Sequence, residues 1–223
     1  MISIRGLSHR VLRIPKLAIG EGYTSFIGPN GGGKTTLLRL CAGIELPERG
    51  DVTVNGGSPR SCEIGYVGEF PDRTLVFERV KDEIASPLRF RHCPCSVMEE
   101  QVEQVAAQLG IGELLQRRTR ELSGGERVLV ALAAALIVSP EILVLDEFDS
   151  HVDMETYEGA LRGIADFEVP HVLHATHHME IACQADMVIF MDEGRARYAG
   201  SPSEVFAALE GSCYQPFGWG VRA

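Results

Sequence analysis

Apolar and polar residues follow two different periodicities along the 223-residue chain. Near the N-terminus, short apolar runs separated by glycine are typical of strands. The runs cover residues 2–5, 12–19, 23–27 and 51–55, and we expect them to form edge and antiparallel strands. From about Phe77 to Arg118, apolar side chains instead recur every three or four residues, which predicts helices.

After Ser139, apolar strands alternate with amphipathic helices. The strands are predicted at residues 142–145, 171–175 and 187–191, and the helices near residues 154–165 and 179–183. This alternation is typical of a parallel sheet with crossover helices. A two-stranded ribbon is expected around residues 192–195, followed by a helix that Ser201 opens and in which Pro202 takes the first position. We therefore expect an α/β fold in one domain, residues 1–223.

Composition places the chain among ordinary globular proteins, with 45% apolar and 23% charged residues. The longest apolar stretch, residues 128–138, is much shorter than the ~20 residues of a membrane-spanning helix, so we expect no such helix. The first residues lack the basic start and apolar run of a secretory signal, which favours a cytoplasmic location and six reduced cysteines. The net charge of −10, with scattered basic residues, disfavours nucleic acid as a partner.

A phosphate loop is predicted at residues 28–36, which read Gly28-Pro29-Asn30-Gly31-Gly32-Gly33-Lys34-Thr35-Thr36. The run fits the pattern G-x-x-x-x-G-K-[ST] and lies between an apolar run and a helical one, as the pattern requires. Backbone N–H groups of such a loop turn toward a phosphate chain, and the helix N-terminus adds partial positive charge. Lys34 would bridge the terminal phosphates, and Thr35 would hold Mg²⁺ through its hydroxyl group. The alternative is a glycine-rich β–α turn without a ligand.

A pair of acids ends the apolar run Ile142-Leu143-Val144-Leu145-Asp146-Glu147. A buried parallel strand delivers side chains at its carboxyl end, where the nucleotide sites of α/β sheets lie. Asp146 could orient Mg²⁺, directly or through water, and Glu147 could polarise the water that attacks the γ-phosphate. Two acids are also common at a solvated strand end, so this interpretation depends on the phosphate loop.

The segment Leu122-Ser123-Gly124-Gly125-Glu126 precedes a predicted long helix over about residues 127–138. Ser-x-x-Glu predicts a capping box, in which Ser123 accepts from the backbone and Glu126 reaches back. The two glycines leave the capped helix start bare, which makes it a second candidate anion site. A second site would be redundant beside the phosphate loop unless it served a different nucleotide.

With these motifs the whole chain resembles the ATP-binding cassette (ABC) ATPases. The matching elements are Walker A at residues 28–36, the signature at 122–126, Walker B at 142–147, the D-loop Asp153 and the switch histidine His177. The resemblance implies an α/β P-loop NTPase fold, in which an ABC ATPase core carries an antiparallel β subdomain and a helical subdomain at about residues 69–120. It also implies hydrolysis of ATP with Mg²⁺.

Two cassettes pack head to tail in this family, so that each ATP lies between the Walker motifs of one subunit and the signature of the other. The resemblance implies catalytic roles for Lys34, for Glu147 as general base, and for His177, which would bond the γ-phosphate and position the water. Ser123 and Gly125 would contact the nucleotide of the partner. The nucleotide of the same subunit would be bound by Asn30, Gly31, Gly32, Gly33, Lys34, Thr35 and Thr36.

Two functional positions depart from the family pattern. Glu69 stands where the family usually has glutamine, and we expect it to ligate Mg²⁺ together with Thr35 and Asp146. The segment that usually supplies an adenine-stacking aromatic reads Leu7-Ser8-His9-Arg10-Val11. His9 is therefore our candidate for the adenine contact, and a solvent-exposed His9 is the alternative.

Two further segments have no place in the family pattern. Phe148 and Asp149 stand where the family usually has proline and threonine. His92-Cys93-Pro94-Cys95 carries ligand types that suit zinc or copper, but only three of them cluster and a second ligand pair is missing. We therefore favour a loop between helices over a metal site at residues 92–95.

The resemblance predicts an ATP-binding and ATP-hydrolysing subunit that powers a membrane transporter. Residues 76–85 are similar to the stretch that docks a cytoplasmic helix of a membrane subunit. Together with residues 200–206, they are most similar to the ATPases of energy-coupling factor importers for vitamins and transition metals such as cobalt. The expected partners are a second copy or a related ABC ATPase, and membrane-spanning subunits that would hold the protein at the inner face of the cell membrane.

Other functions remain open at this point. A soluble ABC ATPase of an assembly system, such as iron–sulfur cluster biogenesis, would co-purify with soluble partners instead of membrane subunits. A kinase or GTPase would have no use for residues 122–126 and would stay monomeric with ATP. DNA-repair and chromosome ATPases need long coiled-coil insertions, for which the interval between Glu69 and Leu122 is too short.

Overall fold

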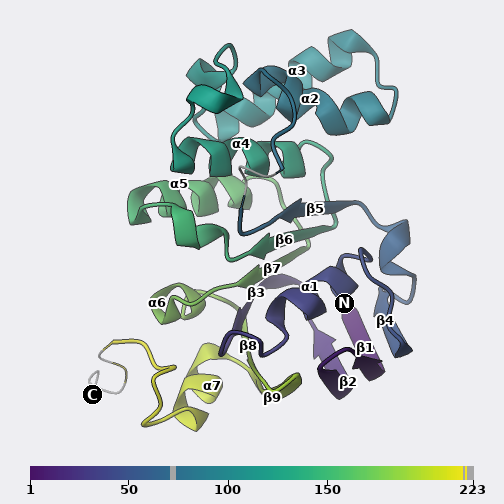
Figure 1. The fold of residues 1–223 in the computed structure, drawn as a ribbon, viewed down its shortest axis with the longest axis vertical. Coiled ribbons are helices and arrows are strands. Elements are labelled where there is room, and N and C mark those ends of the chain that lie inside the picture. The colour runs from purple at the N-terminus through teal and green to yellow at the C-terminus, as the bar shows by residue number, and fades with distance from the viewer. Residues whose placement is uncertain (71–73, 218, 220–223) are drawn as a thin grey trace. The chain divides into compact units, whose positions relative to one another are not determined.

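The computed structural model describes residues 1–70, 74–217 and 219 (Figure 1). The chain divides into two compact units. The first unit consists of Met1–Cys62 together with Pro170–Ala223, and the second unit is the continuous segment Glu63–Val169. Within the described residues, no helix is both long and apolar enough to cross a membrane.

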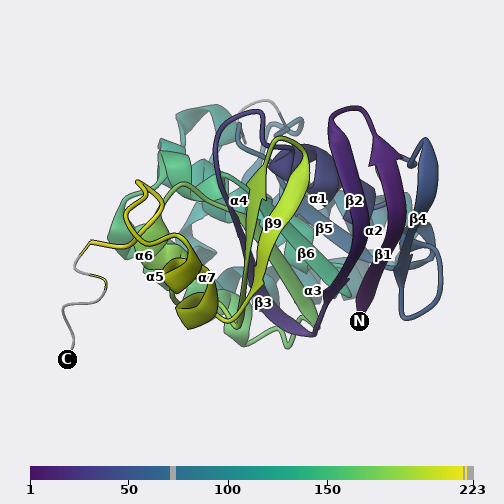
Figure 2. The same ribbon diagram turned by 90° about the horizontal axis from the view of Figure 1, so that it is seen from below.

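The first unit contains a three-stranded antiparallel sheet with the order β2-β1-β4. Its strands are β1 (Ile2–His9), β2 (Leu12–Ile19) and β4 (Arg49–Val54), and Figure 2 shows them side by side. Buried and exposed residues alternate along β1 and β2, since one face of each strand points into the core. The antiparallel strands expected for three of the four N-terminal runs are confirmed.

The remaining N-terminal run, residues 23–27, forms β3 (Gly22–Ile27), and here our expectation of an edge or antiparallel strand is wrong. Strand β3 lies between β7 (His171–Ala175) and β8 (Met187–Asp192) and is parallel to both. The last four residues of β3 are all buried, because a parallel strand in this position is covered on both faces. Strand β9 (Arg195–Gly200) pairs antiparallel with β8, which confirms the predicted ribbon.

Three α-helices accompany the strands in the part of the first unit that the structure describes. They are α1 (Lys34–Cys41), which follows β3 through the glycine-rich loop, α6 (Met179–Ala182) and α7 (Pro202–Ala208), and a 3₁₀ turn η1 spans Pro59–Ser61. Helix α7 begins as predicted, with Ser201 as N-cap and proline at the first position. Its Val205 and Phe206 pack against Val188 and Phe190 of β8 in one apolar cluster.

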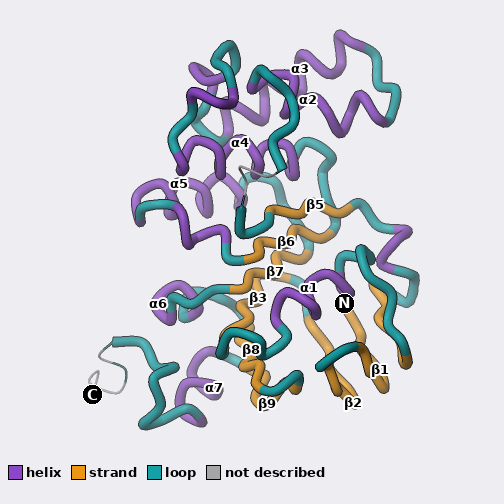
Figure 3. The backbone as a smooth tube through the Cα atoms, in the orientation of Figure 1, coloured by secondary structure: helices purple, strands orange, loops and turns teal. Residues whose placement is uncertain are grey.

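In its described residues, the second unit contains one pair of parallel strands and most of the longer helices (Figure 3). Strand β5 (Ile64–Val67) pairs with β6 (Ile142–Asp146), which is buried at all five positions. Helix α4 (Gly124–Leu136) contacts β5 and α2 (Val80–Phe90). The other α-helices of the unit are α3 (Cys95–Gln108) and α5 (Met154–Ala165). The helical stretch expected from Phe77 to Arg118 is therefore confirmed, and α5 has the predicted bounds.

Short 3₁₀ turns connect the helices of the second unit. They are η3 (Gly112–Leu114), η4 (Thr119–Glu121) and η5 (Phe148–His151). The turn η4 leads into the N-cap of α4, and η5 follows the carboxyl end of β6. The signature segment therefore lies between η4 and α4, and the Walker B acids lie between β6 and η5.

Candidate nucleotide-binding site

The predicted phosphate loop joins the end of β3 to the start of α1 in the first unit. Gly28, Gly31 and Gly33 have φ values of 131°, 77° and 101°, which residues with a side chain rarely adopt. A Cβ atom added at Gly28 would lie 2.0 Å from the carbonyl oxygen of Met191. The loop therefore requires glycine for its backbone conformation and for its close contact with the end of β8.

Lys34 is the first residue of α1, and its side chain folds back over the loop. The residue is only 4% exposed, and Nζ donates to the carbonyl oxygens of Gly28 at 2.9 Å and Pro29 at 3.2 Å. No acidic residue lies in the first turn of α1. The ammonium group and the helix N-terminus thus place positive charge at the same end of α1, where an anion is stabilised.

His177 lies two residues beyond the end of β7, the strand that pairs with β3 beside the phosphate loop. Strands β3 and β7 are parallel with Phe26 opposite Ala175, and the N–H of Thr176 donates to the carbonyl oxygen of Phe26 over 3.1 Å. Parallel strands that end in register deliver their next residues to one sheet edge. The exposed His177 and the start of the phosphate loop therefore leave the sheet at the same edge.

Asp146 is the last residue of β6 in the second unit, and its carboxylate is nearly buried. It is 4% exposed, and its Oδ2 accepts a hydrogen bond of 2.8 Å from the phenol of Tyr66 on the neighbouring strand β5. Glu147 follows with φ of 56°, a left-handed conformation that is uncommon for residues other than glycine and concentrates at functional sites. In Walker B, the Asp146 carboxylate is therefore held by a hydrogen bond, and the next residue, Glu147, is half-buried.

The two residues that replace proline and threonine after Glu147 are buried. Phe148 is fully buried, and its ring lies 5.6 Å from the ring of Tyr157 on α5, centroid to centroid. Asp149 is 5% exposed. Phe148 is thus a core residue that packs the turn after Walker B against α5. The resemblance to the family did not predict this role.

Glu69 leaves the sheet at the same end as Asp146. Strand β5 ends at Val67, and Val67 is paired with Leu145 of β6. Asp146 is the last residue of β6 and Glu69 lies two residues beyond β5, so both carboxylates are at the carboxyl end of one parallel pair. Glu69 is exposed. The structure therefore brings two of the three predicted Mg²⁺ ligands to one edge of the second unit, and the third, Thr35, lies in the first unit.

The signature segment forms the capped start of α4, as predicted. The N–H of Ser123 donates to Glu126 Oε2 at 2.6 Å, and the N–H of Glu126 donates to Ser123 Oγ at 3.3 Å. Arg117 also donates to Glu126 Oε1 at 2.7 Å. The backbone bond from Ser123, followed by the Ser123 side chain and Arg117, holds the pKa of the Glu126 carboxyl below its usual value. The capping box is confirmed.

Gly125 and Asp153 lie on neighbouring elements of the second unit. A Cβ atom at Gly125 would meet Thr156 Cγ2 at 3.5 Å, an ordinary contact, so packing alone does not require glycine there. Asp153 is the N-cap of α5, and its Oδ1 accepts from the N–H of Thr156 at 2.8 Å. The bare turn at Gly125 therefore faces the capped start of α5.

His9, our candidate for the adenine contact, is buried at the end of β1. It is 8% exposed, and its Nε2 lies 2.9 Å from Glu45 Oε2, while Nδ1 is 3.7 Å from Glu48 Oε1. The alternative of a solvent-exposed His9 is therefore wrong. The bond from His9 is the largest of the causes that lower the pKa of the Glu45 carboxyl.

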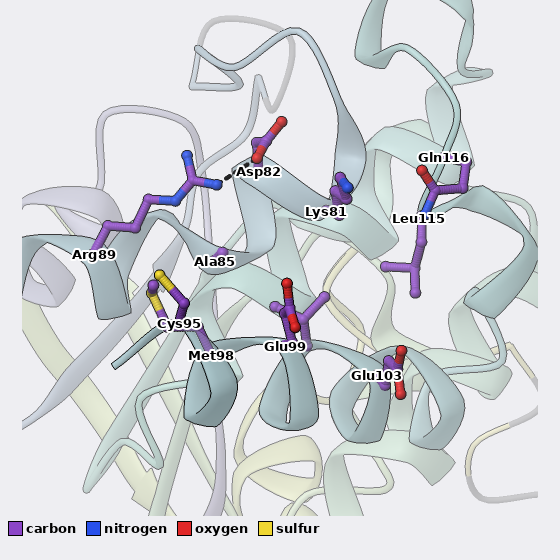
Figure 4. Close-up of a pocket in the computed structure, with 11 residues that line it drawn as sticks. Lys81, Asp82, Ala85, Arg89, Cys95, Met98, Glu99, Glu103, Leu115 and Gln116 are labelled. Carbon is purple, nitrogen blue, oxygen red and sulfur yellow. Dashed lines mark hydrogen bonds and ion pairs between the residues drawn. The ribbon is translucent and has the colours of Figure 1, made fainter. Parts of the chain in front are cut away.

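Residues 92–95 connect α2 to α3, with Cys95 as the first residue of α3. Within residues 1–70, 74–217 and 219, no group of three or more His, Cys, Asp or Glu side chains could hold a metal ion. Cys95 instead lines a cavity of about 430 Å³ between α2 and α3, in which Figure 4 shows it beside Ala85 and the ion pair of Asp82 with Arg89. None of the motif residues lines this cavity.

Two residues that the sequence did not indicate, Tyr66 and Gly194, form hydrogen bonds with predicted site residues that are distant in sequence. Tyr66 bonds Asp146, and the N–H of Gly194 donates to the carbonyl oxygen of Gly32 at 3.1 Å. A tyrosine in a short strand carries no local signal of its hydrogen-bond partner. The Glu193-Gly194 pair did predict a turn, but a turn does not indicate what lies beside it.

Comparison with known proteins agrees with these motifs. A family profile described as ABC transporter matches residues 16–150. The molybdate/tungstate import ATP-binding protein WtpC of Archaeoglobus fulgidus is 36% identical over 200 residues, which cover 86% of this chain and 83% of that protein. The energy-coupling factor transporter ATP-binding protein EcfA1 of Mycoplasma pneumoniae is 35% identical over 216 residues, which cover 91% of this chain and 75% of that protein.

Solved structures of ATP-binding cassettes share the fold. The structure of cbiO1 from Clostridium perfringens, part of the ABC transporter complex cbiONQ, has a TM-score of 0.84 at 26% identity and covers 94% of this chain and 91% of that chain. The dimeric post-hydrolysis state of the ATP-binding cassette MJ0796, bound to ADP and Pi, has a TM-score of 0.82 at 19% identity and covers 91% of this chain and 99% of that chain.

The chain therefore belongs to the ABC transporter family. The expected fold, an α/β P-loop ABC ATPase core, is confirmed. The protein is an ATPase of the kind that powers transport in this family.

Proposed function

We propose that this chain is the ATP-hydrolysing subunit of a membrane importer for a vitamin or a metal ion. The observation that carries the proposal is the phosphate loop, in which the buried Lys34 and the N-terminus of α1 supply the positive charge that a polyphosphate needs. The relatives support import, since WtpC is named for molybdate/tungstate import and EcfA1 for an energy-coupling factor transporter. The neighbour cbiO1 is likewise part of an ABC transporter complex.

Lys34 and the loop would bind the triphosphate of ATP. When ATP enters, the ammonium of Lys34 exchanges the carbonyl oxygens of Gly28 and Pro29 for oxygens of the terminal phosphates. The other phosphate ligands are the backbone N–H groups and hydroxyl groups of Asn30, Gly31, Gly32, Gly33, Thr35 and Thr36. For the adenine we retain His9, whose ring would have to leave its bond to Glu45 before a base could stack on it.

Hydrolysis would depend on Glu147 and His177. Glu147 accepts a proton from the attacking water, whose oxygen bonds to the γ-phosphorus while the bond from that phosphorus to the bridging oxygen of ADP breaks. ADP and inorganic phosphate are the products. His177 bonds the γ-phosphate and positions the water, a role consistent with its exposed place after β7.

Thr35, Asp146 and Glu69 would hold Mg²⁺. A hydroxyl group and two carboxylates are oxygen donors, which Mg²⁺ prefers, so the donor set fits the ion. The bond from Tyr66 fixes the orientation of the Asp146 carboxylate. Mg²⁺ held by these residues would supply positive charge that neutralises the phosphates.

The active form would be a dimer. Every motif needed for hydrolysis lies in this one chain, so a homodimer would have two equal sites, and a heterodimer with a related ABC ATPase would also complete a site. Ser123 and Gly125 of one copy would contact the γ-phosphate held by the partner. Support comes from the N-terminus of the 13-residue helix α4, where Ser123 is the N-cap and the first two residues are glycines without side chains. The partial positive charge of such a helix N-terminus stabilises an anion.

Membrane-spanning subunits would hold the protein at the inner face of the cell membrane. The proposed docking segment, residues 76–85, contributes Lys81, Asp82 and Ala85 to the cavity between α2 and α3. Glu83 fixes the start of this segment, because its Oε2 accepts from the N–H groups of Val76 at 2.8 Å and Phe77 at 2.7 Å. The side chain of Val76 is 81% exposed and is thus open to a partner.

ATP hydrolysis by the purified chain tests the catalytic part of the proposal. Lys34→Ala should lower Mg²⁺-dependent turnover at least about hundredfold, because it removes the side chain that stabilises charge on the terminal phosphates. Lys16→Ala, on the exposed face of β2, is the matched control and should hydrolyse ATP at the parental rate. Equal turnover of the two variants would contradict the role of the phosphate loop.

A pull-down from detergent-solubilised membranes tests the transport part. We expect integral membrane proteins to co-purify with the chain, and transport assays on the assembled complex then identify the vitamin or metal ion. Co-purification with soluble assembly proteins alone would contradict the importer and favour a soluble ABC ATPase.

A further inference from the structure

The turn between β8 and β9 contacts the phosphate loop through a backbone hydrogen bond. Its central residues Glu193 and Gly194 have φ values of 47° and 72°, as in the tight turns that join two antiparallel strands. The N–H of Gly194 donates to the carbonyl oxygen of Gly32 at 3.1 Å, and its own carbonyl oxygen accepts from the N–H of Arg13 at 2.8 Å. Gly194 therefore joins the phosphate loop to the edge strand β2.

The space at Gly194 admits no side chain. A Cβ atom there would lie 1.9 Å from the carbonyl oxygen of Val11 and 2.6 Å from its carbonyl carbon. The phosphate loop lies beside the same residues, since a Cβ atom at Gly33 would lie 2.5 Å from Leu12 Cδ2 and 3.6 Å from the Cα atom of Gly194. A larger residue at position 194 must therefore displace either the chain at Val11 or the β8–β9 turn itself, whose Gly194 N–H is bonded to the phosphate loop at Gly32.

The bond from Gly194 also sets the direction of the N–H group of Gly33. A trans peptide is planar, so the C=O of Gly32 and the N–H of Gly33 point in opposite directions from their shared peptide bond. Because the C=O points back to Gly194, the N–H of Gly33 points forward, away from the β8–β9 turn. Forward N–H groups are the groups with which a phosphate loop binds its anion.

We infer that Gly194, which lies outside every ATPase motif of the chain, is a positioning residue for ATP binding. It holds the Gly32–Gly33 peptide in the orientation that presents the Gly33 N–H to phosphate. The inference rests on the proposed binding of ATP at residues 28–36. A Gly33 N–H that contacts phosphate equally before and during hydrolysis contributes to binding and not to the chemical step, so loss of Gly194 should weaken ATP binding and leave kcat nearly unchanged.

Gly194→Ala and Gly56→Ala form a matched pair for the first test. Gly56 also follows a residue of positive φ in a tight turn, with φ of 82°, but a Cβ atom there would meet nothing within 4 Å. Both variants carry the cost of alanine at positive φ, and only Gly194→Ala also clashes with Val11, which shifts the turn that is bonded to the phosphate loop. We expect the Kd for ATP, from isothermal titration calorimetry, to rise about tenfold in Gly194→Ala, or about 1.4 kcal/mol, and less than twofold in Gly56→Ala.

Arg13→Pro tests the same connection from the side of β2, because the proline ring takes the place of the hydrogen and forces the Gly194 carbonyl group away. Proline removes the N–H that donates to the carbonyl oxygen of Gly194. The strand tolerates proline at this side, because β2 is the edge strand and Pro15 already stands two residues further along it. Arg13→Ala keeps the N–H and is the control. We expect the KM for ATP to rise severalfold in Arg13→Pro alone, with kcat within about twofold of the parental value.

The outcomes separate this inference from the proposed function. If the parental chain binds no ATP, the proposed function fails. If it binds ATP and the two test variants match their controls in Kd and KM, Gly194 has no positioning role and the inference is overturned. A variant that lowers kcat as strongly as it raises KM would also overturn it, since the loss would then lie in the chemical step. Thermal melting without ATP identifies any variant that has lost its fold.

Discussion

The phenol of Tyr66 donates a hydrogen bond of 2.8 Å to Oδ2 of Asp146. The two residues lie on the parallel strands β5 and β6, and Asp146 is only 4% exposed. A carboxylate that is held by a neighbouring donor keeps one orientation, and such outer contacts commonly decide how well a metal ligand works. We therefore expect Tyr66 to support the proposed binding of Mg²⁺ by Asp146, although Tyr66 lies in no motif.

Tyr66→Phe should raise the Mg²⁺ concentration that gives half-maximal ATP hydrolysis by about tenfold, because the Asp146 carboxylate loses its fixed orientation. The measurement is a Mg²⁺ titration of turnover at saturating ATP. Tyr198→Phe is the control, since Tyr198 is 42% exposed on β9 in the other unit. An unchanged titration midpoint in Tyr66→Phe would contradict a role of this bond in metal binding.

Glu69→Gln should retain or increase Mg²⁺-dependent turnover. An amide oxygen ligates Mg²⁺ much as a carboxylate oxygen does, and the neutral side chain removes a negative charge close to the polyphosphate. Initial rates of ATP hydrolysis over a range of Mg²⁺ concentrations check this. A loss of turnover greater than about tenfold would be incompatible with a simple ligand role for Glu69.

Glu126→Gln should change how stability depends on pH. The folded protein lowers the pKa of the Glu126 carboxyl, chiefly through the backbone bond from Ser123. A lowered carboxyl pKa gives stability that is present above the ordinary value of 4.5 and is lost as the pH falls through the lowered folded value. Glutamine can still cap the helix but carries no charge.

The parental chain should therefore melt at most about 3 °C above Glu126→Gln at pH 7, since an exposed ion pair contributes little. The difference should shrink as the pH falls below 4.5 and vanish once the pH is below the lowered folded pKa, where the carboxyl is protonated in the folded and the unfolded chain. A difference that stays constant from pH 7 to pH 3 would show that the charge of Glu126 is not its cause.

Local features of the site could be predicted from the sequence. The capping boxes at Ser123 and Ser201 depend on residues three positions apart, so a short window contains the whole interaction. The phosphate loop is equally local, because its glycines and Lys34 follow one another between a strand and a helix. A short stretch of sequence was therefore sufficient to predict the two capping boxes and the position of the phosphate loop.

Features that depend on distant partners could not be predicted in this way. A short apolar run such as that of β3 has no signal that distinguishes an edge strand from a central parallel one. His9 is buried because Glu45 and Glu48 approach it from another part of the chain, and Gly194 reaches Gly32 only after the sheet has formed. These contacts follow from strand order, which propensity and periodicity do not determine.

The central claim is that ATP is bound between the phosphate loop of one copy and the capped start of α4 of another. Glu147→Gln tests it most directly, because the variant should bind ATP and hydrolyse it at least about hundredfold more slowly, so that the closed complex accumulates. Light scattering of this variant should give the mass of a dimer with ATP and of a monomer without it. The double variant Lys34→Ala with Glu147→Gln should stay monomeric. A monomer of Glu147→Gln at saturating ATP, with ATP shown to be bound, would contradict the account.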